Sequence, residues 1–175
     1  MQKKATISIF DNRYISVEAE HFTRKNESGG IQWEIIPDLG KTWSGVTTFP
    51  QNIYPTASDK IYLEYDLNFE TTGEFKLYIL VSPTLNFNGN KGLRYAVSFD
   101  GGEEQIVNIN GKYTSRQMEK WQANSINQTI TNHKIEKTGI HTLRFRVLEP
   151  GIVLQKIMID RGGLKNSYLG APEKF

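Results

Sequence analysis

Residues 61–81, which read IYLEYDLNFETTGEFKLYILV, decide the fold class. Apolar side chains occupy every second position from Ile61 to Phe69, and more polar side chains stand between them. Side chains of a β-strand point alternately to opposite faces, so this pattern predicts a strand with one buried and one solvated face. Gly73 marks a turn, and the alternation returns in residues 75–81. The stretch therefore predicts a second strand that runs antiparallel to the first.

The same signals recur along most of the chain. Helical spacing occurs only at residues 116–123, where Ser115 is suited to cap a short helix. Many short strands separated by turns are typical of a sandwich or barrel. We predict an all-β fold, an antiparallel, jelly-roll-like β-sandwich with at most one short helix. Further strands are predicted at residues 5–9, 14–19, 31–35, 43–49, 93–99, 105–109, 126–135, 142–147 and 153–159.

The sequence shows no sign of a boundary between domains. No linker, low-complexity stretch or repeat interrupts the sequence, so residues 1–175 are predicted to form one domain. Residues 162–175 lack periodicity and are predicted to form an irregular C-terminal tail that wraps over the surface.

The composition excludes several classes of function. The formal net charge is +2, from 21 basic and 19 acidic residues, and no basic run is present, which argues against nucleic acid as a partner. The chain has no cysteine, so disulfides, thiolate nucleophiles and cysteine-based zinc sites are excluded. No apolar run approaches the ~20 residues needed to cross a bilayer, so we expect no membrane partner.

No catalytic motif stands out. The three histidines, His21, His133 and His141, share no metal-ligand spacing. The sequence contains no nucleophile elbow, phosphate-binding loop or zinc-protease motif. We therefore predict that the isolated domain is not an enzyme.

The stretch Val17-Glu18-Ala19-Glu20 suggests a metal site. In an extended strand Glu18 and Glu20 would point to the same side, where two carboxylates repel each other unless a cation lies between them. Calcium prefers several oxygen ligands, and Asp160, near the end of the last predicted strand, could add a third. The alternative is a solvated strand end, or pairing of these acids with Arg24 or Lys25.

Aromatic residues in predicted loops suggest a sugar-binding site. Sugars bind by stacking on an aromatic plane while polar side chains hold their hydroxyls. The alternative is that large aromatics are core residues, and Trp33 and Trp121 fit that description better than a ligand platform. Tyr54, beside a proline, is the stronger candidate for exposure. The predicted carbohydrate-binding residues are Trp43, Tyr54, Asn88 and Trp121.

Four stretches in combination point to a family: YISVEAEHFTR (14–24), PDLGKTWSGVTTFP (37–50), LRYAVSFDGG (93–102) and the ending from 141 to 173 that contains PGIVLQKIMID and GGLKNSYLGAPE. They resemble the C-terminal domain of glycoside hydrolase family 115 enzymes, which are xylan α-glucuronidases. The resemblance runs from about Tyr14 to Glu173. It implies a β-sandwich, catalytic groups in upstream domains, and a secreted or periplasmic location in a bacterium, although the N-terminal residues MQKKATISIF contain no signal-peptide core.

The same region is more distantly similar to carbohydrate-binding modules of families 6 and 35. Those sandwiches often begin with an E-A-E strand whose acids help to hold a structural calcium, which here implies Glu18, Glu20 and Asp160 as ligands. The following His21-Phe22 departs from that pattern. Two functions remain open: a non-catalytic accessory module that binds xylan or glucuronoxylan at loop aromatics, or a structural domain that packs against a catalytic domain or forms a dimer interface.

Overall fold

The computed structural model describes residues 14–86, 92–111, 115–164 and 169–173, apart from the side chains of Ser115, Met118 and Trp121. Strands dominate these residues, accompanied by one α-helix and one 3-10 turn. In chain order the elements are β1 (Tyr14–Glu18), η1 (Ala19–His21), β2 (Arg24–Asn26), β3 (Gln32–Ile36), β4 (Gly45–Phe49), β5 (Tyr62–Phe69), β6 (Gly73–Val81), β7 (Arg94–Phe99), β8 (Gln105–Asn108), α1 (Ser115–Asn124), β9 (Asn127–Ile135), β10 (Gly139–Val147) and β11 (Leu154–Asp160).

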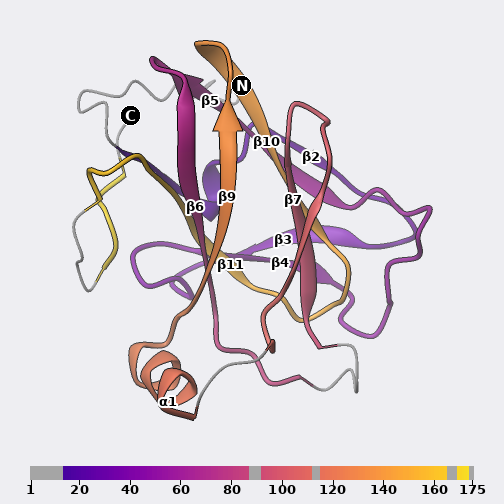
Figure 1. The fold of residues 1–175 in the computed structure, drawn as a ribbon. Helices are drawn as coiled ribbons and strands as arrows, with labels where there is room; N and C mark the ends of the chain where they lie inside the picture. The colour runs from indigo at the N-terminus through magenta and orange to yellow at the C-terminus, as the bar shows by residue number, and fades with distance from the viewer. Residues whose placement is uncertain (1–13, 87–91, 112–114, 165–168, 174–175) are drawn as a thin grey trace.

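The strands form two antiparallel sheets, which confirms the predicted all-β sandwich. One sheet has the order β3-β4-β11-β6-β9, with β1 paired to β11 as its sixth strand. The other has the order β2-β5-β10-β7-β8. In Figure 1, β6 and β9 run side by side and α1 lies at the lower end of the molecule, close to the start of β9.

The stretch 61–81 supplies one strand to each sheet. β5 pairs with β2 and β10, whereas β6 pairs with β9 and β11. The turn before Gly73 therefore carries the chain from one sheet to the other, and the alternating apolar side chains of both strands meet in a single core. Fully buried core residues from the two strands are Leu63, Tyr65, Leu67, Leu77, Ile79 and Val81.

Four local expectations need comment. The predicted strand at residues 5–9 lies outside the described residues. The short edge strand β2 was missed, because Arg24-Lys25-Asn26 has no apolar alternation. β4 begins at Gly45, so Trp43 belongs to the preceding loop. The helix is longer by one residue at each end than the 116–123 range.

The described part of the C-terminal tail, 162–164 and 169–173, contains no helix or strand. It lies on the outer face of the six-stranded sheet, where Ala171 and Leu164 pack with Met158 and Leu80 in a second, smaller apolar cluster. In the parts of the chain that the structure describes, no helix is both long and apolar enough to cross a bilayer.

Candidate functional site

Trp43 is the most exposed of the predicted sugar-binding residues that the structure describes. It lies in the loop between β3 and β4, and 57% of its surface is exposed. The loop is closed by a hydrogen bond from the Gly40 amide to the Trp43 carbonyl oxygen, 2.8 Å long. A Cβ at Gly40 would lie 2.5 Å from that oxygen, so only glycine fits there. The amide of Lys41 donates to the Gln155 side chain, which ties the loop to β11.

An acidic and imidazole cluster lies beside Trp43. The ring of His21, at the end of η1, is 6.3 Å from the Trp43 ring, centroid to centroid, at an angle of 57°. Its Nδ1 is 2.8 and 2.9 Å from the two carboxylate oxygens of Glu173, in the C-terminal tail. Its Nε2 is 3.9 Å from Glu20. Three segments distant in sequence therefore meet here: η1, the β3–β4 loop and the tail.

Glu18 lies in the same region but is buried, and its partner is a lysine. Its Oε1 is 2.8 Å from the ammonium of Lys156, and the two side chains are only 2% and 3% exposed. Thr42 donates a 2.7 Å hydrogen bond to the same carboxylate oxygen. The Lys156 ammonium also donates to the carbonyl oxygens of Ala171 and Leu169, 3.1 and 3.5 Å away. The positive charge beside Glu18 is therefore the ammonium of Lys156, where the sequence predicted a calcium ion.

The three predicted calcium ligands do not come together. In the β1–β11 pair Glu18 faces Lys156 and Tyr14 faces Asp160, so Glu18 and Asp160 stand four residue pairs apart, ~13 Å along the strands. Glu20 follows the strand in a 3-10 turn, where the alternation of an extended strand no longer applies. Within the described chain, no group of three or more acidic or imidazole side chains is arranged to hold a metal ion. The structure therefore does not bring Glu18, Glu20 and Asp160 together as one set of calcium ligands.

Asp160, at the far end of β11, instead accepts hydrogen bonds from backbone amides of the turn that follows the strand. Its Oδ1 accepts hydrogen bonds from the amides of Gly162, Gly163 and Leu164, at 2.8, 3.0 and 3.0 Å. These bonds fix the turn that leads into the tail. Its carboxylate is therefore used by the fold.

Among the other predicted sugar-binding residues, only Tyr54 has a side chain that the structure describes, and it does not lie beside Trp43. Tyr54 is 51% exposed, but it follows β4, whereas Trp43 precedes it. The register of the β3–β4 hairpin thus places the two rings at opposite ends, four or more residue pairs apart. Asn88 and the side chain of Trp121 lie outside the described residues. Trp33 is buried at 5% exposure, as the core interpretation predicted.

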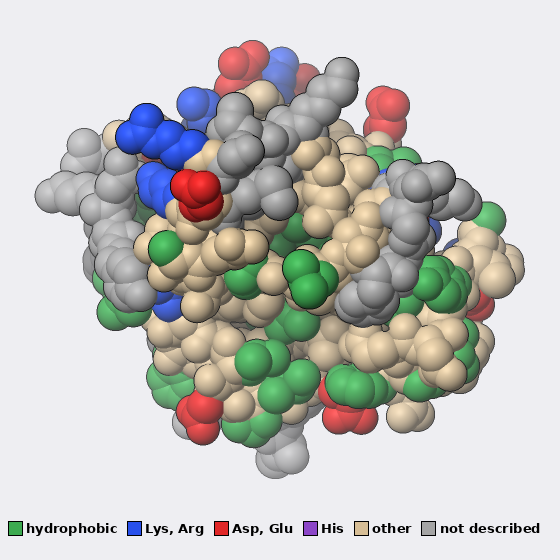
Figure 2. Space-filling view, turned by 90° about the horizontal axis from the view of Figure 1, so that it is seen from below, with side chains coloured by type: hydrophobic (Ala, Val, Ile, Leu, Met, Phe, Trp, Pro, Cys, Tyr) green, Lys and Arg blue, Asp and Glu red, His purple; other side chains and the backbone are tan. Residues whose placement is uncertain are grey.

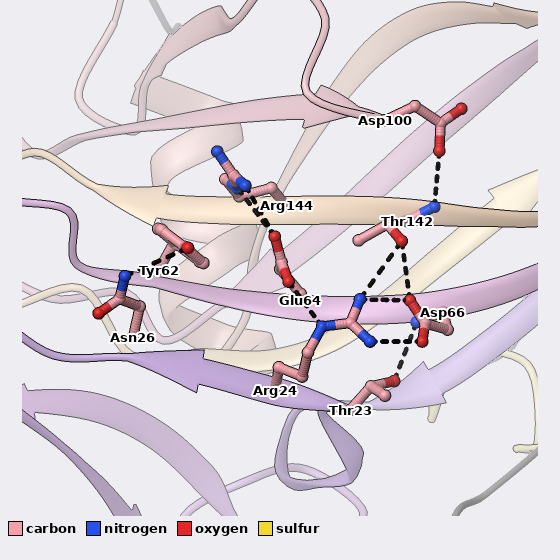
Figure 3. A network of polar contacts seen from close by, with 9 residues as sticks. All are labelled: Thr23, Arg24, Asn26, Tyr62, Glu64, Asp66, Asp100, Thr142 and Arg144. Atoms are coloured by element: carbon pink, nitrogen blue, oxygen red, sulfur yellow. Dashed lines mark hydrogen bonds and ion pairs between the residues drawn. The ribbon is translucent and has the colours of Figure 1, made fainter.

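A second polar surface covers the outer face of the five-stranded sheet, and sequence reasoning missed its organisation. Figure 3 shows Glu64 of β5 between Arg24 of β2 and Arg144 of β10. Arg24 also forms two hydrogen bonds with Asp66, which accepts a further bond from Thr142. The alternating charges marked these residues as a solvated face, but only the strand order brings them into contact.

The charges of this network neutralise one another. Burial alone would raise the pKa of Glu64, but hydrogen bonds from Arg24 and Arg144 outweigh it and hold that pKa below its ordinary value. The hydrogen bonds that Arg24 donates to Asp66 and, with a smaller effect, to Glu64 raise the pKa of Arg24. The guanidinium of Arg144 also lies 4.1 Å from the ring centroid of Tyr62. Because these groups already satisfy one another, the Trp43 region is the better candidate for a ligand.

Comparison with known proteins identifies the family. The sequence model of the family described as "Glycosyl hydrolase family 115 C-terminal domain" matches residues 9–173, nearly the whole chain. The chain belongs to this family. No curated protein matches it.

Solved structures share the fold of this family 115 C-terminal domain. BtGH115A, a family 115 4-O-methyl-α-glucuronidase with specificity for decorated arabinogalactans, matches with a TM-score of 0.66 and 19% identity over 91% of this chain. The chain spans only 19% of that enzyme's length. A family 35 carbohydrate-binding module from Clostridium thermocellum matches with a TM-score of 0.54 and 19% identity, covering 83% of this chain and 97% of the module.

A third match is the C-terminal family 6 module of LamC, a laminarinase from Zobellia galactanivorans. It has a TM-score of 0.51 and 17% identity, and covers 84% of this chain and 98% of that module. At these identities the similarity concerns the fold. It confirms the β-sandwich, and it confirms the family resemblance together with the more distant one to families 6 and 35.

Proposed function

We propose that this family 115 C-terminal domain is a non-catalytic accessory module of a xylan-degrading α-glucuronidase, and that it binds the polysaccharide at Trp43. The observation that carries the proposal is the exposed indole of Trp43, whose ring lies 6.3 Å from the ring of His21, which in turn has the carboxylates of Glu173 and Glu20 at its two nitrogens. An apolar plane next to acceptors for hydroxyl groups is the arrangement that a sugar ring requires. The structural neighbours from families 35 and 6 are carbohydrate-binding modules, which supports the same role for this domain.

The proposal includes where the protein acts. A module that binds plant polysaccharide must meet it outside the cytoplasm, so the proposed location is secreted or periplasmic in a bacterium.

The energy available at Trp43 sets the expected effect of removing it. An aromatic side chain can bury up to ~250 Å², so 57% exposure leaves roughly 140 Å² free. A sugar that covers about half of this area removes roughly 70 Å² from water, worth about 2 kcal/mol at ~25 cal/mol per Å². Trp43→Ala should therefore weaken binding by roughly 20- to 30-fold.

The test is affinity electrophoresis and calorimetry with glucuronoxylan, arabinoxylan and a decorated arabinogalactan. The wild-type domain is expected to bind at least one xylan, and Trp43→Ala to lose that binding. Ile130→Ala is the matched control, since Ile130 is exposed and lies on β9, at the opposite edge of the six-stranded sheet from β3 and β4. Absence of binding to every xylan, or full binding by Trp43→Ala, would refute the proposal.

One observation favours a second function, packing against the rest of the enzyme. Six of the eleven large hydrophobic side chains that are exposed in the described residues lie between positions 35 and 54. Figure 2 shows hydrophobic side chains spread over one end of the sandwich, with most charged side chains near its margin. Exposed apolar side chains on one module of a larger enzyme are candidates for contacts with its other domains. The six residues are Ile35, Leu39, Trp43, Phe49, Ile53 and Tyr54.

The packing function predicts an effect that appears only in the complete enzyme. Ile35→Lys and Ile53→Lys should lower the melting temperature of the enzyme that carries this domain, and leave the isolated domain unchanged. Ile140→Lys is the control, because Ile140 is 66% exposed and lies outside this segment. Equal melting temperatures for all three enzyme variants would contradict packing through the 35–54 segment.

A further inference from the structure

A hollow of about 820 Å³ opens at the end of the six-stranded sheet that lies away from α1. It extends over the start of β6, the end of β9 and the turn that follows β11, and Gln105 of β8 and His133 of β9 also line it. Figure 1 shows this end of β9 at the top of the molecule, opposite α1. The volume lies within the ~300–1,000 Å³ that is typical of sites for small ligands.

The hollow is separate from the Trp43 region. Asp160 lines the hollow, whereas Glu18 accepts a hydrogen bond from Thr42, which belongs to the same loop as Trp43. Asp160 and Glu18 stand at opposite ends of the β1–β11 pair. A ligand in the hollow would therefore use residues that a ligand on Trp43 does not contact.

Three side chains that line the hollow carry polar groups that the fold does not use. Glu74 and Lys76 alternate with the buried Phe75 along β6, so both point to the outer face, and Asn132 of β9 stands directly opposite Lys76. All three are exposed, and in the parts of the chain that the structure describes no hydrogen bond or ion pair engages their side chains. A carboxylate accepts hydrogen bonds, an ammonium donates them and an amide does both.

An uncharged ring borders these polar groups. The imidazole of His133 stacks on Phe75, with ring centroids 5.7 Å apart and an interplanar angle of 22°, and its Nε2 is 2.8 Å from the hydroxyl of Thr131. The Gln105 amide donates a 2.9 Å hydrogen bond to the carbonyl oxygen of Asn132, which ties β8 to β9 at this edge of the sandwich. Burial lowers the pKa of His133 to about 4, so the ring is neutral at neutral pH. The hollow therefore combines a fixed, flat, uncharged ring with hydrogen-bonding groups of both kinds.

We infer that this hollow is a second, weaker carbohydrate site, which takes an uncharged sugar residue. Sugar hydroxyls both donate and accept hydrogen bonds, so Glu74, Lys76 and Asn132 offer partners of both kinds, while the ring of His133 offers an apolar face. A charged ligand would gain from either Glu74 or Lys76 and be repelled by the other. The inference rests on the proposed function only for the class of ligand, since the residues differ.

The site in the hollow should be weaker than the one at Trp43. The imidazole of His133 is half-buried, whereas 57% of the surface of Trp43 is exposed, so the hollow offers a sugar less apolar area. Binding there should therefore become visible only at millimolar sugar, and a method that follows individual residues is needed to detect it.

The experiment is a nitrogen–proton NMR titration of the Trp43→Ala domain with an unbranched xylo-oligosaccharide up to millimolar concentration. The backbone amides at positions 76 and 132 report on the hollow. Two double variants are compared in the same background. Lys76→Met/Asn132→Ala removes two of the unused polar groups, and Lys120→Met/Gln128→Ala is the matched control, because both of its residues are exposed and lie on α1 and at the start of β9.

In the Trp43→Ala domain the amides of Lys76 and Asn132 are expected to shift in a saturable manner. Lys76→Met/Asn132→Ala should raise the dissociation constant at the hollow by about tenfold or more, since hydrogen bonds from an ammonium and to an amide are lost. The control Lys120→Met/Gln128→Ala should leave it unchanged.

The outcomes separate this inference from the proposed function. Sugar that binds only at Trp43, or an equal effect of the two double variants, would overturn the second site and leave the proposed function standing. Sugar that binds in the hollow while Trp43→Ala binds as tightly as the wild type would overturn the proposed function and leave the second site standing. Absence of binding at both surfaces would overturn both.

Discussion

Replacing Lys156 by methionine removes the ammonium that faces Glu18 inside the sheet and leaves most of the aliphatic volume in place. The carboxylate of Glu18 then remains 2% exposed with the hydroxyl of Thr42 as its polar side-chain contact. Two tail carbonyls, those of Leu169 and Ala171, also lose their lysine donor. The variant therefore tests whether the buried pair fastens the C-terminal tail to the sandwich.

The expected cost follows from burial. Removing one partner of a buried ion pair costs about 3–5 kcal/mol, because an uncompensated charge is left behind. For a domain of this size 1 kcal/mol corresponds to about 2–4 °C, so the melting temperature should fall by roughly 6–20 °C. The matched control is Lys134→Met, which breaks an exposed pair with Glu136 whose side chains are 61% and 76% exposed. Such surface pairs contribute about 0–1 kcal/mol.

Urea unfolding, followed by tryptophan fluorescence and by circular dichroism, measures both variants. The double variant Glu18→Gln/Lys156→Met carries no buried charge and should recover part of the lost stability. The reasoning is refuted if Lys156→Met is no more destabilising than Lys134→Met. It is also refuted if the double variant is as unstable as Lys156→Met, since the unpaired carboxylate would then not be the cause.

Three further predictions concern the loop, pH and metal. Gly40→Ala should destabilise the domain by more than about 1 kcal/mol and weaken sugar binding, because its Cβ would collide with the Trp43 carbonyl oxygen; chemical unfolding and calorimetry measure the two effects. Burial lowers the pKa of His133 to about 4, so the fold prefers the neutral ring. The contribution of His133 to folding stability is complete above about pH 6.5 and is lost as the pH falls toward 4. The expected loss is about 1–2 kcal/mol after allowance for the partial exposure of the ring. Over this pH range the melting temperature of His133→Gln should therefore fall less than that of the wild type. EDTA should leave the melting temperature unchanged, because the structure does not bring together the three carboxylates assigned to calcium; a chelator-sensitive transition would contradict this.

The alternation of apolar residues was sufficient to predict the sandwich, since burial of one face enforces a period of two. The alternation could not show that β5 and β6 lie in different sheets. A turn that connects two sheets and a turn that closes a hairpin within one sheet have similar sequences. The edge strand β2 was not predicted because its residues have no buried face and are held in a strand only by pairing with β5.

The candidate site was predicted only in part. Trp43, predicted to bind sugar, is indeed exposed, because its neighbours Thr42 and Ser44 in a turn-rich segment offer no apolar side chain to cover it. The role of Glu18 was misread, since its partner Lys156 lies 138 positions along the chain and only the β1–β11 register brings the two together. Glu173 was missed altogether, because nothing in an irregular tail indicates that its carboxylate returns to His21.

The central claim, that sugar binds at Trp43, is tested most directly by the indole N–H signals in a nitrogen–proton NMR spectrum of the labelled domain. The Trp43 signal is assigned by its loss in Trp43→Phe, and the Trp33 signal serves as an internal control because its indole donates to the Asn26 carbonyl inside the fold. Titration with an unbranched xylo-oligosaccharide is predicted to shift the Trp43 signal in a saturable manner and to leave the Trp33 signal in place. A Trp43 signal that stays fixed while the sugar binds, or while no sugar binds at all, would contradict the account.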